Sequence, residues 1–139
     1  MNKLITGFDR AVDHPDFAKL LLRLVFGLLM LFHGSFKLVH GVDWIKPMLA
    51  AHGLPGFVAY GAYIGEIAAP LLIILGVWTR VAGLVYAINL VFAVVLVVGG
   101  NFFKTTDVGA WALETEALYF FGGLIIMLLG AGKYSISRQ

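Results

Sequence analysis

Three residues that could take part in chemistry lie in long apolar runs of this sequence. His33 and Lys37 stand four residues apart near the end of the first run, and Glu66 lies halfway along the second. At the centre of a bilayer a charged side chain costs at least about 2.5 kcal/mol on insertion scales, so it needs a partner, a water-filled cavity or a function. These positions are therefore the first candidates for a site.

Glu66 gives the strongest single signal. If the second run enters the membrane near Phe57, nine residues of helix place Glu66 about 13 Å deep, close to the midplane. Pro70 cannot donate a hydrogen bond to the Glu66 carbonyl and tends to kink a helix there, and Tyr63 adds a hydroxyl one turn away. The pattern predicts a polar pocket. It is either functional, or a structural ion pair or neutral carboxyl that fixes the packing of the helices.

The first run carries two cations on one helical face. Arg23 and Lys37 are 14 residues apart, which is nearly four turns, and small residues between them permit close approach of another helix. This face is therefore predicted to contact protein; it comprises Arg23, Gly27, Met30, Gly34 and Lys37. The alternative is that each cation snorkels to its nearer interface as an anchor. His33, one turn from Lys37, is either a hydrogen-bonded packing residue or part of a site.

Glu116 and Tyr119 in the fourth run complete the candidates. Glu116 is expected near the height of Lys37, so a simple Lys37–Glu116 ion pair is as plausible as chemistry. The candidate ligand-binding set is His33, Lys37, Glu66, Glu116, Tyr63, Tyr119 and Arg23. We expect it in the outer half of the helices, with a short helix around Trp44 as its lid. The absence of cysteine excludes thiolate metal sites, and no metal site is predicted.

The composition identifies the class of protein that must position these residues. Hydrophobic residues make up 60% and charged residues 13% of the chain, and the mean hydropathy is +0.92. Soluble domains carry about a quarter charged residues, so this is an integral membrane protein with a single domain. The net charge of +2 includes no basic run, which argues against nucleic acid as a partner.

Four apolar runs predict an all-α four-helix bundle. A helix crosses the bilayer in about 20 residues, and the expected spans are 17–39, 57–78, 81–99 and 111–129. Residues 1–16 carry apolar residues at helical spacing and predict an amphipathic interfacial helix. A second short amphipathic helix is expected between residues 42 and 55, outside the first two spans.

The basic residues predict the orientation. One side of the membrane would hold Lys3, Arg10, Lys19, Arg80, Lys133 and Arg138, and the other Lys46 and Lys104. Cytoplasmic loops carry the excess of Lys and Arg, so both termini are expected in the cytoplasm of a cell whose inner membrane holds the protein.

Several short motifs together resemble the DoxX family. In order, they are Arg23-x3-Gly27-x5-His33-Gly34-x2-Lys37-Leu38, Gly53-Leu54-Pro55, Gly65-Glu66, Leu75-Gly76-x2-Thr79-Arg80, Glu116 and Gly130-x-Gly132-x-Tyr134-Ser135. The resemblance covers nearly the whole chain after residue 16. It implies a four-span protein of the cytoplasmic membrane, similar to the membrane subunit of a thiosulfate:quinone oxidoreductase. Ala131 stands where the family ending commonly has proline.

Three functions remain open at this point. The first is a quinone-binding or non-catalytic subunit of a membrane oxidoreductase complex, with quinone as the cofactor and a soluble redox protein as partner. The second is a structural or assembly scaffold of a membrane complex, and the third is a carrier of a small solute or anion. The bilayer is a partner in each case, and a lipophilic small molecule or further copies of the chain are candidates.

Overall fold

The regular structure of this chain is helical, as expected for an all-α protein. The computed structural model describes residues 2–98 and 102–137, and an isolated bridge between Thr105 and Trp111 is the non-helical pairing found there. The elements are α1 (Lys3–Val12), α2 (Pro15–His40), η1 (Asp43–Ile45), α3 (Lys46–Ala51), η2 (Gly56–Tyr60), α4 (Gly61–Tyr63), η3 (Ile64–Ala68), α5 (Ala69–Leu75), α6 (Thr79–Val98) and α7 (Glu114–Leu129). The elements η2, α4, η3 and α5 follow one another without a break.

Among the described residues, three helical segments are long and apolar enough to cross a membrane. They are Pro15–His40, Gly56–Leu75 and Thr79–Val97. The fourth helix, α7, has 16 residues and begins at Glu114, three residues after the start expected at Trp111. About 20 helical residues span the hydrocarbon core, so α7 is the shortest of the four packed helices. Residue 99, the expected end of the third span, lies outside the described residues.

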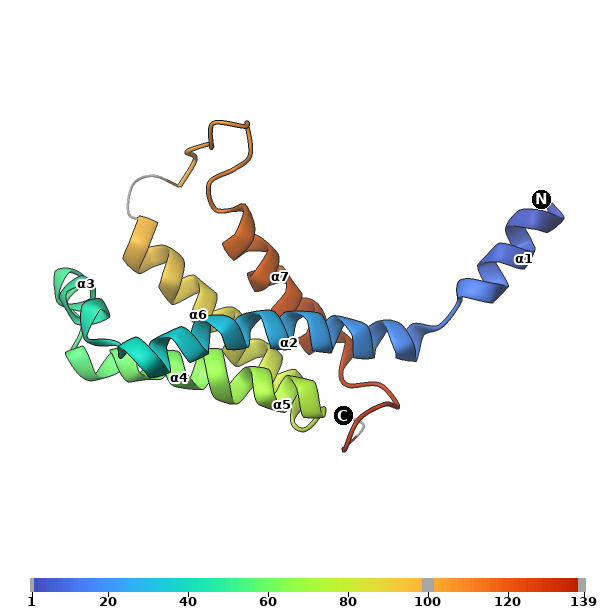
Figure 1. Cartoon of the computed structure of the whole chain (residues 1–139), viewed down its shortest axis with the longest axis horizontal. Helices are drawn as coiled ribbons and strands as arrows, with labels where there is room; N and C mark the ends of the chain where they lie inside the picture. Colours follow the sequence, from blue (N-terminus) through green and yellow to red (C-terminus); the bar gives the residue numbers. More distant parts are fainter. Residues whose placement is uncertain (1, 99–101, 138–139) are drawn as a thin grey trace.

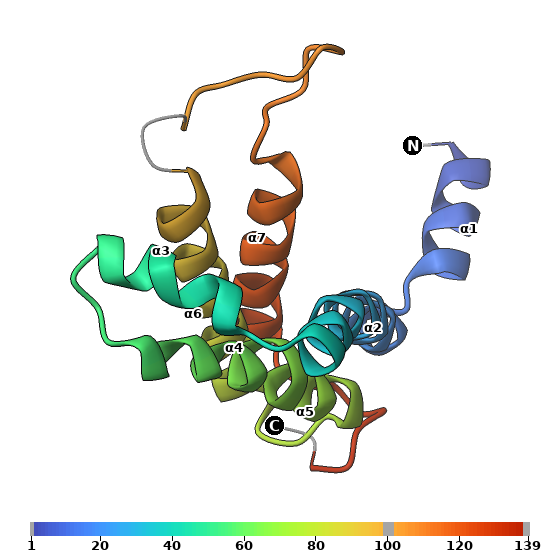
Figure 2. The same ribbon diagram turned by 60° about the vertical axis from the view of Figure 1, so that its left-hand side comes forward.

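The four long helical segments pack as two neighbouring pairs. The segment from η2 to α5 lies alongside α2, and α7 lies alongside α6, which crosses the first pair at an angle (Figures 1 and 2). Gly83 and Gly123 allow the second pair to approach closely, because a side chain at position 83 would lie 2.7 Å from the carbonyl oxygen of Gly123. Such small-residue contacts are a common basis for helix association in membranes.

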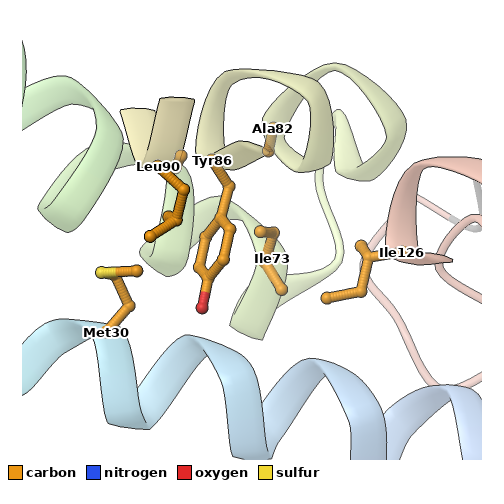
Figure 3. Close-up of a cluster of buried hydrophobic side chains, with 7 residues drawn as sticks. Met30, Ile73, Ala82, Tyr86, Leu90 and Ile126 are labelled. Atoms are coloured by element: carbon orange, nitrogen blue, oxygen red, sulfur yellow. The ribbon is translucent and has the colours of Figure 1, made fainter. Parts of the chain in front are cut away.

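The core lies where the two pairs meet. Side chains from all four helices fill it, and Figure 3 shows Met30 of α2, Ile73 of α5, Tyr86 of α6 and Ile126 of α7 converging there. Tyr86 is fully buried and donates its hydroxyl proton to the carbonyl oxygen of Phe26 at 3.0 Å. The phenol thus joins α6 to α2 without leaving a buried polar atom unpaired.

Two short helices stand outside this core. The first, α1, projects away from the bundle and buries none of its residues (Figure 1). Its apolar side chains recur at helical spacing, so the expected amphipathic helix is present, and its place at the membrane interface remains a prediction. The second, α3, follows η1 at the other end of α2. A small core beneath it includes Val42, Leu49 and Ala59, and this core holds α3 against η2.

Candidate functional site

Lys37 and Glu66 form an ion pair between α2 and the π-helical segment η3. The ammonium nitrogen of Lys37 donates to both carboxylate oxygens of Glu66 at 2.5 Å. The side chains are 16% and 5% exposed, and Asn89 of α6 offers its amide Nδ2 to Glu66 Oε2 at 3.4 Å. Lys37 is thus the cation that pairs with Glu66. Lys37 therefore does not snorkel to the interface.

The local backbone explains how Glu66 reaches this position. Residues Ile64–Ala68 form a π-helical turn directly before Pro70, whose missing N–H leaves the carbonyl of Glu66 without its usual helical donor. Gly34 lies against this turn, and a side chain there would collide with the Glu66 carbonyl. Because Lys37 follows Gly34 by three residues, close contact at Gly34 brings the ammonium group to the carboxylate.

The ion pair forms part of the wall of a cavity of about 290 Å³. Lys37, Glu66 and Asn89 provide its polar groups. The remaining wall is apolar and includes Ile45, Met48, Leu49, Val58, Ala62, Ile64, Ile88, Phe92 and Leu96. Ile64 of η3 and Ile88 of α6 are 59% and 46% exposed on membrane-spanning segments. The cavity thus lies between helix faces that meet the bilayer.

The short outer helix covers one end of this cavity. The ring of Trp44 lines it, with its centre 6.0 Å from the ammonium nitrogen of Lys37. Lys46 pairs with Asp43 at 2.8 Å and contacts Tyr60, with the tyrosine hydroxyl at 3.3 Å. The hydrogen bond to Asp43, and then the one to Tyr60, raises the pKa of Lys46 above its ordinary value. These contacts connect the lid expected around Trp44 to η2, which ends at Tyr60.

Arg23 does not join this group. Its guanidinium is buried and donates to the carbonyl oxygens of Ile73 and Ile74 at 2.8 Å. It also donates to Ala131 at 2.9 Å and Tyr134 at 2.8 Å. Of the predicted face of α2, Arg23, Gly27, Met30 and Gly34 are buried, which confirms that it contacts protein. Arg23 acts there as a cap for the end of α5 and a clamp for the C-terminal segment.

Of the remaining candidates, Tyr63 lies beside the ion pair, and His33, Tyr119 and Glu116 lie apart from it. His33 is exposed and meets the edge of the Tyr119 ring at 5.7 Å between centres, on the side of α2 that faces α7. Tyr63 is adjacent to the pair, since its hydroxyl donates to the carbonyl oxygen of Lys37 at 3.1 Å. The alternative of an ion pair between Lys37 and Glu116 is not found, because Lys37 pairs with Glu66. Glu116 lines a different cavity, between α6 and α7.

Asn89 was missing from the predicted set. It is a polar residue in the third apolar run, and it makes an interhelical hydrogen bond to the Glu66 carboxylate. Gly65 permits the close approach of Asn89, because a side chain at position 65 would collide with it. The glycine that precedes Glu66 in the second run is therefore the position at which α6 packs closely.

Comparisons with known proteins agree with this architecture. A profile of the DoxX family matches residues 18–99, which is more than half of the chain. A protein of Bacillus subtilis (strain 168) named "Putative oxidoreductase CatD" is 30% identical over 82 residues. That match covers 59% of this chain and 60% of the relative, so less than two thirds of the relative's length is represented. No solved structure matches the chain significantly. By the extent of the profile match, the chain is a membrane protein of the DoxX family.

Proposed function

We propose that this protein binds a quinone beside Lys37 and Glu66 and serves as a membrane subunit of an oxidoreductase complex. The observation that carries the proposal is a buried ion pair in the wall of an apolar cavity. Apolar walls with a few convergent polar groups are the usual make-up of a site for a small molecule. The name of the Bacillus relative supports a redox role over other uses of such a site.

The cavity suits the head of a lipophilic ligand. Its volume of about 290 Å³ lies at the lower end of the range for small-molecule sites, which is about 300–1,000 Å³. A planar ring would occupy it, and an apolar tail would leave between α6 and η3, where Ile64, Ile88 and Phe92 meet the bilayer. Entry from the membrane would need no aqueous channel.

The residues of the site have distinct roles in this proposal. A bound quinone supplies two-electron redox chemistry in which two protons are taken up on reduction. Lys37 donates a hydrogen bond to a carbonyl oxygen, and the amide of Asn89 offers a second donor. Glu66, which contacts the ammonium group directly, holds and returns a proton at the same place. A soluble partner protein delivers the electrons.

The other two functions have different support. A scaffold role is favoured by Arg23, whose charge is used to fix helix ends. The carrier hypothesis rested on a row of cations facing Glu66, and of that row only Lys37 meets the carboxylate in the described residues. The cavity beside Lys37 therefore favours the ligand-binding role over transport.

Binding of a short-chain quinone tests the proposal. Purified protein in lipid nanodiscs is titrated with decylubiquinone, and quenching of tryptophan fluorescence is followed, since Trp44 lines the cavity. Lys37→Met removes the donor, and Ala93→Phe fills the cavity without touching the ion pair; each should weaken binding at least tenfold. Lys104→Met, at an exposed loop position, is the control. Unchanged binding by both cavity variants would show that quinone does not bind there.

We also propose that the protein lies in the cytoplasmic membrane with both termini inside the cell. Lys3 and Arg10 lie in α1, Lys19 lies near the start of α2, Arg80 near the start of α6 and Lys133 after the end of α7, and Arg138 lies outside the described residues. The absence of cysteine allows single-cysteine labelling in intact cells. A cysteine at position 104 should react with an impermeant reagent from outside, and one at 133 should not; the reverse pattern would invert the topology.

A further inference from the structure

A second cavity lies between α6 and α7, at the same end of the bundle as the first. Its volume is about 620 Å³, and Leu90 and Val94 of α6 face Phe120 of α7 across it. Phe102 and Trp111, from the segment that joins the two helices, lie at its outer end. It shares no lining residue with the cavity beside Lys37. It therefore calls for its own interpretation.

One acidic group enters this apolar space. Glu116 lines the cavity, and its Oε2 is buried without a hydrogen-bond donor among the residues that the structure describes. The carboxyl group of Glu116 thus lies beside the cavity without a partner among the described residues. Glu116 also lies in the first turn of α7, where the helix dipole favours a negative charge. A cation in the cavity would be attracted to this carboxylate.

The aromatic walls point to the same kind of group. The rings of Phe102, Trp111, Phe120 and Phe121 line the cavity around Glu116. Organic cations are attracted to the faces of such rings, and a carboxylate among aromatic side chains binds them through both charge and ring contacts. His52, the other titratable residue of the lining, uses its Nδ1 for the carbonyl oxygen of Met48 at 2.9 Å.

We propose that this cavity binds a hydrophobic organic cation, with Glu116 as its counter-ion and the surrounding aromatic rings as its walls. The charge of the region agrees, because residues 102–117 contain Asp107, Glu114 and Glu116 against the single cation Lys104. A neutral acyl chain would fill the volume without compensating the charge of Glu116, and a hydrophobic anion would meet a like charge. This inference does not depend on quinone binding at Lys37.

A pair of probes with matched shape and opposite charge tests this inference. Tetraphenylphosphonium and tetraphenylborate are compared for saturable binding to the full chain in nanodiscs of zwitterionic lipid, with radiolabelled probes. The wild-type protein should bind the phosphonium at least tenfold more tightly than the borate. Equal binding of the two ions would overturn the proposal, whatever the variants show.

Two variants locate the site and one controls for general charge. Glu116→Gln should abolish the preference for the cation, and Ala117→Phe, which fills the cavity and keeps the carboxyl, should abolish binding. Glu114→Gln removes the same charge from an exposed position two residues away and should bind as the wild type does. If Glu116→Gln retains the preference, or Glu114→Gln loses it equally, the cation does not bind at Glu116.

Discussion

Removing Lys37 should destabilise the protein more than neutralising Glu66. In Lys37→Met the carboxylate keeps one neighbour, the Asn89 amide at 3.4 Å, and its side chain is 5% exposed. Such a group cannot regain its hydration in place, and breaking a buried ion pair from one side typically costs about 3–5 kcal/mol. We expect Lys37→Met to lower the free energy of unfolding by an amount in this range.

Glu66→Gln leaves a different residue without its partner. The ammonium group of Lys37 is at the end of a flexible stem, is 16% exposed, and belongs to the last turn of α2. It can therefore swing toward the interface, and the glutamine can still accept a hydrogen bond. The expected cost is about 1–3 kcal/mol, which is the range for loss of one buried hydrogen-bonding interaction.

A double-mutant cycle measures the coupling. Unfolding is followed by circular dichroism as sodium dodecyl sulfate replaces a mild detergent, for both single variants, Lys37→Met/Glu66→Gln and the exposed control Lys104→Met. The double variant strands no charge, so it should be more stable than Lys37→Met alone, with a coupling energy of about 1–3 kcal/mol. Additive effects of the two substitutions would contradict this reasoning, and so would a Lys37→Met variant as stable as the wild type. Either result would show that water in the cavity already hydrates the Glu66 carboxylate.

Three further outcomes follow from single contacts. Arg23→Gln should lower the unfolding free energy by at least about 3 kcal/mol and speed cleavage of the C-terminal segment by carboxypeptidase, because the clamped carbonyls lose a charged donor; unchanged cleavage would contradict the clamp. Gly34→Ala should destabilise the protein in the detergent titration, whereas Gly61→Ala, with open space around it, should be neutral or stabilising; equal effects would show that close packing at Gly34 is unimportant. Asp43→Asn should lower the pKa of Lys46 in a lysine-selective NMR titration. Since the pKa of Lys46 is raised in the folded state, the contribution of the pair to stability is present below the ordinary lysine pKa and is lost as the pH rises through the folded value. An unchanged pKa would mean that Asp43 does not cause the shift.

The sequence predicted the helices well because their length and composition are set by the bilayer. It also predicted which face of α2 contacts protein, since that depends on the spacing of Arg23, Gly27, Met30 and Gly34 along one helix. The pairing of Lys37 was open for a different reason. Height along a helix follows from 1.5 Å per residue, and by height Glu66 and Glu116 were both within reach. Which helices are neighbours depends on their packing, and the close contact at Gly34 places α2 against η3, which holds Glu66.

The roles of the arginines were equally hard to obtain from spacing. Arg23 satisfies carbonyl oxygens at the end of α5, and Arg80 donates to Met127 and Leu128 at the end of α7, at 3.0 and 2.7 Å. The last carbonyls of a helix lack intrahelical donors, and a guanidinium has five donors to offer them. Gly76 and Gly130, both with positive φ, end α5 and α7. Spacing along the sequence cannot distinguish an arginine that caps such a helix end from one that serves as an interfacial anchor.

The buried charges at the two ends of the bundle therefore have different surroundings. At the end that holds the termini, the buried cation Arg23 gives four of its five N–H donors to backbone carbonyls, so its charge stabilises the fold. At the other end, the carboxylates of Glu66 and Glu116 each line a cavity, one with a cation supplied by Lys37 and one without a partner in the described residues. A pure scaffold would gain nothing from leaving Glu116 unpaired beside an apolar cavity. If the proposed ligands bind at Lys37 and Glu116, variants at these two positions should leave the contacts of Arg23 at the other end of the bundle unchanged.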